Sequence, residues 1–240
     1  MYGWMGKVLF VNLNERMAEV KPLCDEIAHT FIGGRGLGAR MLWELVDAKV
    51  EPYSPDNALI FATGPLTATG FQTSGRFSVS TKSPLTDTIL DCNCGGVWGV
   101  RFKQTGHDVL VITGQADSPV YLEISPEGVR FKDASELWGK TVSQTTEALG
   151  GKNRSVLCIG PAGENLVRFA SIMVDKSRAL GRGGPGAVMG AKKLKAIVVS
   201  GDKRPGVYNP ELFNFVRYEA TKLLRANPVT SQGLPLFGTA

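Results

Sequence analysis

One order of segments occurs twice in this chain and restricts its fold more than any other feature. Ala58 to Pro65 and Val156 to Pro161 both show a buried-strand pattern that ends in Gly-Pro. Each is followed by a second strand candidate, Arg76 to Thr81 in the first case and Arg168 to Val174 in the second. A repeated order of segments predicts a repeated structural unit. We therefore expect an internal duplication whose second half begins near Lys152.

The match continues through two glycine-rich segments. Gly95 to Gly99 and Gly186 to Gly190 each lead into a basic helix, and each helix is followed by a strand that ends in glycine, Asp108 to Gly114 and Ala196 to Gly201. Two such halves place two glycine loops on either side of a pseudo-twofold axis, where a nearly symmetric ligand would fit. The expected fold class is α+β, with two related β-sheet halves and short helices.

Outside the repeat, hydrophobic periodicity and turn residues predict further elements. These are a hairpin of Lys7 to Asn12 with Met17 to Lys21, a helix at Asp25 to Phe31, a tight turn at Gly33 to Gly38, a helix at Ala39 to Val46, and a hairpin of Val120 to Ile124 with Val129 to Phe131.

The end of the chain differs in character from the rest. Asp202 to Gly206 is typical of a linker, and Asn209-Pro210-Glu211 begins a helix that runs to about Ala226. Asn227 to Ala240 contains prolines and glycines without a packing pattern. We expect one domain at residues 1–203, then a linker and the truncated start of a helical domain at residues 204–240.

Composition narrows the class of protein. With 240 residues, 43% hydrophobic and 20% charged, the chain is typical of a globular protein with a large core. Its apolar runs are too short for a membrane span, it begins without a signal-peptide pattern, and four scattered cysteines suit a reducing compartment. We therefore expect a cytoplasmic protein. The net charge of +5 is dispersed along the chain, which argues against a nucleic-acid partner.

The densest functional signal is the run from Arg178 to Gly186, in which Arg178 and Arg182 flank a glycine loop. Backbone N–H groups of such loops favour anions, and guanidinium groups bind phosphate with two hydrogen bonds. Arg76 begins a strand, and its side chain either points toward the same ligand or is solvated or paired with a carboxylate. Asn93 is either a turn residue or faces a ligand or metal ion.

Conventional catalytic patterns are weak. His29 and His107 are the only histidines, and they favour surface or packing roles. The pair Cys92 and Cys94 supplies two of the four ligands that a cluster needs, so either a small-residue loop or a metal role fits it.

Five segments together resemble the aldehyde:ferredoxin oxidoreductase family. They are Gly33-Gly34-Arg35-Gly36-Leu37, Gly64-Pro65-Leu66-Thr67, Ser83-Pro84-Leu85-Thr86, Ile159 to Asn165, and Arg178 to Lys195. The resemblance covers about Met1 to Gly201 and implies an α+β amino-terminal domain on which a tungsten (or molybdenum) bis-pterin cofactor rests.

The resemblance also assigns residues. It implies that the cofactor, its phosphates, or a magnesium ion bridging those phosphates is contacted by Arg76, Asn93, Gly95, Arg178, Ala179, Gly181 and Arg182. Of these, Asn93 and Ala179 are implied to contact the magnesium ion. Tungsten is held by the pterins, so no protein ligand to it is expected.

The family's iron-sulfur cysteines, a C-x2-C-x3-C run, do not occur in this sequence. The resemblance implies that the complete enzyme oxidises an aldehyde to a carboxylate and passes electrons to ferredoxin, with the remaining domains or a separate polypeptide supplying the cluster; a homodimer is compatible with it. The alternative is a stand-alone pterin- or phosphate-binding module, or one half of a split enzyme.

Overall fold

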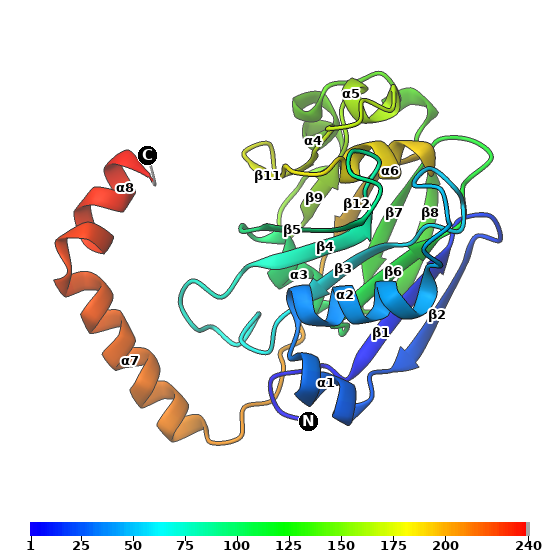
Figure 1. Cartoon of the computed structure of the whole chain (residues 1–240). Coiled ribbons are helices and arrows are strands. Elements are labelled where there is room, and N and C mark those ends of the chain that lie inside the picture. Colours follow the sequence, from blue (N-terminus) through cyan, green and yellow to red (C-terminus); the bar gives the residue numbers. More distant parts are fainter. Residues whose placement is uncertain (239–240) are drawn as a thin grey trace.

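The computed structural model describes residues 1–238 and contains two six-stranded β-sheets with short helices around and between them (Figure 1). Sheet A contains β1 (Lys7–Asn12), β2 (Met17–Pro22), β3 (Leu59–Thr63), β4 (Phe77–Lys82), β5 (Ile89–Cys94) and β6 (Val109–Thr113). Sheet B contains β7 (Val120–Ser125), β8 (Gly128–Asp133), β9 (Ser155–Cys158), β10 (Ile172–Val174), β11 (Arg178–Leu180) and β12 (Leu194–Val199). The helices are α1 (Asp25–Phe31), α2 (Gly34–Leu45), α3 (Trp98–Gln104), α4 (Val142–Leu149), α5 (Pro161–Glu164), α6 (Pro185–Ala191), α7 (Pro210–Ala226) and α8 (Leu234–Phe237), with short helical turns at Ser135–Leu137 and Val229–Gly233.

The two sheets have the same topology. Sheet A runs β2-β1-β6-β3-β4-β5, and sheet B runs β8-β7-β12-β9-β10-β11, so every strand of the second half is the counterpart of the strand six places earlier. The pairing directions also agree. β1 pairs with β6 in parallel, as β7 does with β12, and the other neighbours are antiparallel. The predicted α+β fold with two related halves is confirmed.

The predicted start of the second half, near Lys152, is wrong. The hairpin β7–β8 opens the second half at Val120, because β7 joins sheet B beside β12 just as β1 joins sheet A beside β6. Local patterns could not reveal this boundary, because the sequence pattern of a hairpin is the same whichever sheet the hairpin joins.

Three apolar layers hold the halves together. The largest lies between the sheets and contains Trp98 and Phe102 of α3 with Val188 and Met189 of α6. The outer face of sheet A is covered by α1 and α2, and the outer face of sheet B by α4 (Figure 1). The helices also cross between halves, because α3 contacts β9 and β12 while α6 contacts β3.

The central strands β3 and β6 of sheet A are apolar up to their final threonine, and both of their faces are buried. In β3, Leu59 and Phe61 belong to the layer between the sheets, whereas Ile60 and Ala62 belong to the layer beneath α1 and α2. This explains why these segments show continuous apolar runs in the sequence.

Several glycine segments differ from the predictions. The predicted turn at Gly33 to Gly38 is wrong, since α2 already begins at Gly34. The glycines serve packing instead: a Cβ atom at Gly38 would lie 2.3 Å from the Ser80 hydroxyl oxygen. The segment from Cys92 to Cys94, expected in a loop, forms the end of β5 because it pairs with β4.

Other predicted boundaries also shift. The expected strand from Arg168 to Val174 contains only Ile172–Val174. Gly186 to Gly190 lies within α6, so the loop that corresponds to Gly95-Gly96 is Gly181 to Gly184. The segment after Asn227, expected to be irregular, forms helical turns from Val229 to Phe237, and its last two residues lie outside the described part of the chain.

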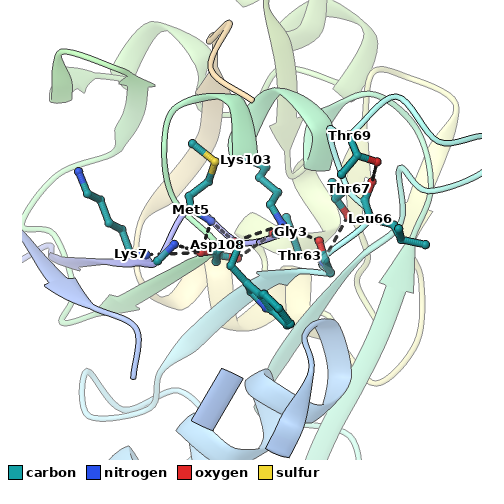
Figure 2. Close-up of polar contacts among 12 residues, drawn as sticks. Gly3, Met5, Lys7, Thr63, Leu66, Thr67, Thr69, Lys103 and Asp108 are labelled. Atoms are coloured by element: carbon teal, nitrogen blue, oxygen red, sulfur yellow. Dashed lines mark hydrogen bonds and ion pairs between the residues drawn. The ribbon is translucent and has the colours of Figure 1, made fainter. Parts of the chain in front are cut away.

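A buried ion pair fastens the amino terminus to α3 (Figure 2). Lys103 Nζ lies 3.2 Å from an Asp108 carboxylate oxygen, and both side chains are fully buried. Lys103 also donates to the carbonyl oxygens of Gly3, at 2.7 Å, and Gly64, at 2.6 Å, while Asp108 accepts from the backbone N–H of Gly6 at 2.7 Å. This network fixes the carboxyl end of the helix that follows the Gly95-Gly96 loop.

By contrast, α7 extends away from the two-sheet body and has no buried residue (Figure 1). None of the helices within residues 1–238 combines the length and apolar character that crossing a lipid bilayer demands.

Candidate binding site between the two halves

The two glycine loops meet where the edge strands β5 and β11 approach each other. A Cβ atom at Gly96 would lie 3.5 Å from Cγ of Arg178, so the loop of one half contacts the strand of the other. The Ser83 hydroxyl donates to the carbonyl oxygen of Gly183 at 2.6 Å, which joins the halves a second time. The two glycine loops therefore lie close to the contact between the halves.

Asn93 and Ala179 occupy equivalent positions in the two halves. Phe77, the first residue of β4, pairs with Cys94, the last of β5; Ile172, the first of β10, pairs with Leu180, the last of β11. Asn93 and Ala179 each precede that last residue, and both are exposed. Two backbone segments related in this way present the same groups to a ligand between them.

Beside this seam lies a hollow of about 730 Å³ lined by four arginines. Arg76, Arg178, Arg204 and Arg217 contribute their side chains, and Gly95 and Gly96 contribute backbone. No aspartate or glutamate lines it within the part of the chain that the structure describes. Four cations without a lining carboxylate form a site for a multiply charged anion.

The Gly95 backbone is open to this hollow. A Cβ atom at Gly95 would have no described neighbour within 4 Å, apart from the adjoining residues. A cradle that a side chain would fill, together with guanidinium donors, suits a ligand that approaches the backbone closely and has phosphate groups.

The arginines at the seam form no ion pair with any carboxylate among the described residues. Arg76 donates instead to the side-chain oxygen of Asn93, and no ion pair among residues 1–238 includes Arg76, Arg178 or Arg182. Burial raises the pKa of the Cys94 thiol, and the positive charges of Arg178 and Arg76 act in the opposite direction. The thiol is therefore held neutral beside the arginine site.

The structure brings together most of the predicted site residues. Arg76, Gly95 and Arg178 line the hollow, and Asn93 is bonded to Arg76. Ala179 follows Arg178 in β11, and Gly181 begins the second loop, but neither lines the hollow. Arg182 does not line it either, contrary to the expected convergence of the three arginines. Arg76 and Arg178 also do not occupy equivalent positions in the repeat. Arg76 immediately precedes β4, and the residue that immediately precedes the equivalent strand, β10, is Ser171.

Sequence reasoning missed Arg204 and Arg217. Arg204 lies in the segment predicted as a linker, and Arg217 lies on α7, where a charged residue is ordinary. No local sequence pattern marks either residue as part of a binding site. They lie beside Arg76 only because the chain after Gly201 folds back along the hollow.

The remaining titratable candidates have structural partners. His107 is buried and lies 2.9 Å from the Thr105 hydroxyl through Nδ1, and burial, followed by the charges of Lys7 and Lys203, lowers its pKa to about 4. Lys195 forms a buried ion pair with Glu164. Within residues 1–238, no group of three or more His, Cys, Asp or Glu side chains comes together as a metal site.

The fold and this site together define a two-sheet domain of two related halves with an arginine-lined hollow beside their contact. Residues 8–201 match the family model described as aldehyde ferredoxin oxidoreductase, N-terminal domain. The chain belongs to this family and corresponds to its amino-terminal domain.

Among related proteins, the tungsten-containing aldehyde ferredoxin oxidoreductase of Pyrococcus abyssi is 49% identical over 100% of this chain and 40% of its own length. The aliphatic sulfonate oxidoreductase, WOR-like subunit, of Pyrococcus furiosus is 36% identical over 93% of this chain and 39% of its own. Among solved structures, the active-site complex BamBC of benzoyl coenzyme A reductase with 1,5-dienoyl-CoA has a TM-score of 0.90 and 37% identity, covering 94% of this chain and 35% of that one. The chain thus spans about 40% of the length of the curated relatives it matches most extensively.

Proposed function

We propose that this chain forms the cradle of a bis-pterin tungsten cofactor in an aldehyde:ferredoxin oxidoreductase. The observation that carries the proposal is the hollow beside the contact between the two halves, which is lined by arginines and open glycine backbone and by no carboxylate among the described residues. A cofactor with two similar pterins suits a domain built from two similar halves, and its phosphates suit the arginines. The tungsten named for the relatives supports the choice of metal, although molybdenum fits the same donors.

Each half supplies part of the proposed cradle. Arg76, Arg178 and Arg182 bind the phosphate oxygens, whereas Gly95 and Gly181 let the backbone approach the pterins. A magnesium ion bridging the phosphates would contact Asn93 and Ala179, whose equivalent places in the repeat support a shared ligand. Magnesium prefers oxygen ligands, and side-chain amide and backbone carbonyl oxygens are ligands of this type.

In the complete enzyme, the bound cofactor supplies two-electron oxidation of an aldehyde and water to a carboxylate. We propose that the electrons leave through an iron-sulfur cluster to ferredoxin, and that the cluster ligands belong to the remaining domains or a separate polypeptide. This chain, residues 1–203 in particular, would hold and orient the cofactor without providing the acid or base of the reaction. The 240-residue chain alone should show no aldehyde-dependent reduction of viologen dyes.

A second possibility is one half of a split enzyme or a stand-alone pterin- or phosphate-binding module. The observation in its favour is that the chain spans about 40% of its relatives. A neighbouring gene encoding C-x2-C-x3-C would favour the split enzyme, and activity on mixing the two polypeptides would establish it.

The proposed function is tested by producing the chain in a host that makes the tungsten cofactor. Tungsten measured by mass spectrometry and pterin measured by fluorescence after oxidation should appear in a ratio of one metal to two pterins. Recovery of the folded chain with neither tungsten nor pterin, under conditions in which a full-length relative is loaded, would contradict the proposal.

A further inference from the structure

We propose that Arg204 and Arg217 complete a phosphate-binding site with Arg76 and Arg178, so that a phosphate group of the cofactor ties α7 to the two-sheet body. The inference rests on the proposed function and extends it to residues outside the family domain, whose match ends at residue 201. No residue of the segment after Gly201 has a role in the family resemblance described above.

The geometry places the two additional arginines on the far wall of the same hollow. Arg204 comes from the segment that leaves β12, and Arg217 lies in the middle of α7. A Cβ atom at Gly70, on the opposite side, would lie 3.3 Å from Nη1 of Arg217, so this guanidinium reaches the body. The side chain of Gln72 donates to the carbonyl oxygen of Arg217 at 2.9 Å and fixes that turn of the helix.

The charges point to an anion between the walls. None of the ion pairs formed by residues 1–238 includes Arg204 or Arg217, and no described lining residue is acidic. Guanidinium groups that face one hollow repel each other until an anion lies between them. A phosphate group has about two negative charges and accepts paired hydrogen bonds from arginine, so it suits this arrangement better than a single carboxylate.

Few contacts hold α7 and the residues just before it to the body. The rings of Phe71 and Phe213 lie 5.9 Å apart, those of Tyr2 and Tyr208 lie 5.3 Å apart, and no residue of α7 is buried. An element with so little buried surface opens at low free-energy cost. A phosphate contacted from both walls would therefore change the opening of α7 more than that of the sheets.

The test uses pyrophosphate as the probe with the cofactor-free 240-residue chain. Calorimetry measures the affinity, and hydrogen exchange measures protection of residues 210–226. We expect pyrophosphate to bind, to slow exchange in α7 at least fivefold, and to bind at least tenfold more weakly to Arg204→Gln and Arg217→Gln. Arg225→Gln is the matched control, because Arg225 is exposed on the same helix and does not line the hollow.

Equal affinities for wild type, Arg204→Gln and Arg217→Gln would overturn the proposal, as would binding without any change in α7. A third arm identifies the source of the phosphate: chain loaded with pterin should no longer bind pyrophosphate at this site. If loaded chain binds pyrophosphate as before, the site does not receive the cofactor. If wild type, Arg204→Gln and Arg217→Gln all retain the cofactor equally well, the proposed function stands and only the role of Arg204 and Arg217 is contradicted.

Discussion

The two loop-helix units of the repeat, residues 95–104 and 181–192, occupy equivalent places but are packed differently. The first loop is open at Gly95, where a Cβ atom would have no described neighbour within 4 Å beyond the adjoining residues. In the second loop, a Cβ atom at Gly183 would lie 2.4 Å from Leu90, and one at Gly184 would lie 1.9 Å from the carbonyl oxygen of Arg168. The first loop is therefore open at Gly95, whereas the second loop is closely packed at Gly183 and Gly184.

The helix ends differ as well. Lys103, near the end of α3, is buried with Asp108, whereas Lys192 follows α6 and donates only to the carbonyl oxygens of Pro55 and Gly114. No ion pair within residues 1–238 includes Lys192, and burial lowers its pKa to about 7. Among the described residues, one helix thus ends near a buried lysine that has a buried carboxylate partner, and the other near a buried lysine that has no ion-pair partner.

The largest expected effect distinguishes these two lysines. Lys103→Met leaves the Asp108 carboxylate buried without its cation, so unfolding free energy should fall by about 3 to 5 kcal/mol. Lys192→Met removes a cation that has no buried counterion, and its cost should stay below about 1.5 kcal/mol. Urea denaturation of both variants measures the difference. Equal losses would show that the two helix ends do not differ as described.

The second loop should be intolerant of a methyl group. Gly184 has a φ of 80° and adjoins the Arg168 carbonyl, so Gly184→Ala should cost roughly 3 kcal/mol through backbone strain and displacement. Thermal unfolding should shift downward by roughly 6 to 12 °C. An unchanged melting temperature would mean that this loop is not a packing element.

Stability should depend on pH through Lys192. Its folded pKa of about 7 lies below the ordinary lysine value, so the unfolded chain binds more protons between about pH 7 and the unfolded pKa of 10.5. The contribution of Lys192 to the free energy of unfolding therefore increases as pH rises across that window. This added stability is lost again as pH falls toward 7. Denaturation of wild type and Lys192→Met from pH 6 to 10 should show a steeper increase for wild type; parallel curves would contradict the assignment.

The smallest effect on stability is expected in the first loop. Gly95→Ala places a methyl group in open space at a position without a positive φ, so unfolding free energy should change by less than about 0.5 kcal/mol. Pterin content should nevertheless fall, because the methyl group occupies the proposed cradle. A loss of stability with normal pterin content would reverse the comparison between the loops.

The repeat could be predicted from the sequence because strands such as β3 are apolar on both faces and are followed by Gly-Pro. It did not reveal where the second half begins, because the parallel pairing of β7 with β12 joins residues more than 70 positions apart. Cys92 to Cys94 was mistaken for a loop, since small and polar residues in a short edge strand lack an apolar pattern. The glycine and arginine pattern pointed to Arg178, and the family resemblance added Arg76 and Gly95, whereas Arg204 and Arg217 depend on a tertiary approach that local patterns do not encode.

The cofactor assignments of all seven residues remain predictions: Arg76, Asn93, Gly95, Arg178, Ala179, Gly181 and Arg182. For Arg182 the expectation is specific: because it has no carboxylate partner among the described residues, Arg182→Ala should leave the melting temperature of the cofactor-free chain unchanged while cofactor retention falls about tenfold. A lower melting temperature with normal retention would assign Arg182 to the loop structure instead.

The central claim is tested most directly by comparing Arg178→Gln with Arg35→Gln. Arg178 lines the hollow without an ion pair, whereas Arg35 is an exposed arginine paired with Asp91 on the neighbouring strand β5, at 2.9 Å. Tungsten and pterin bound per folded chain are measured after production in a host that makes the cofactor. The account predicts at least a tenfold loss for Arg178→Gln and none for Arg35→Gln. Equal retention by both variants would contradict a cofactor cradle at this site.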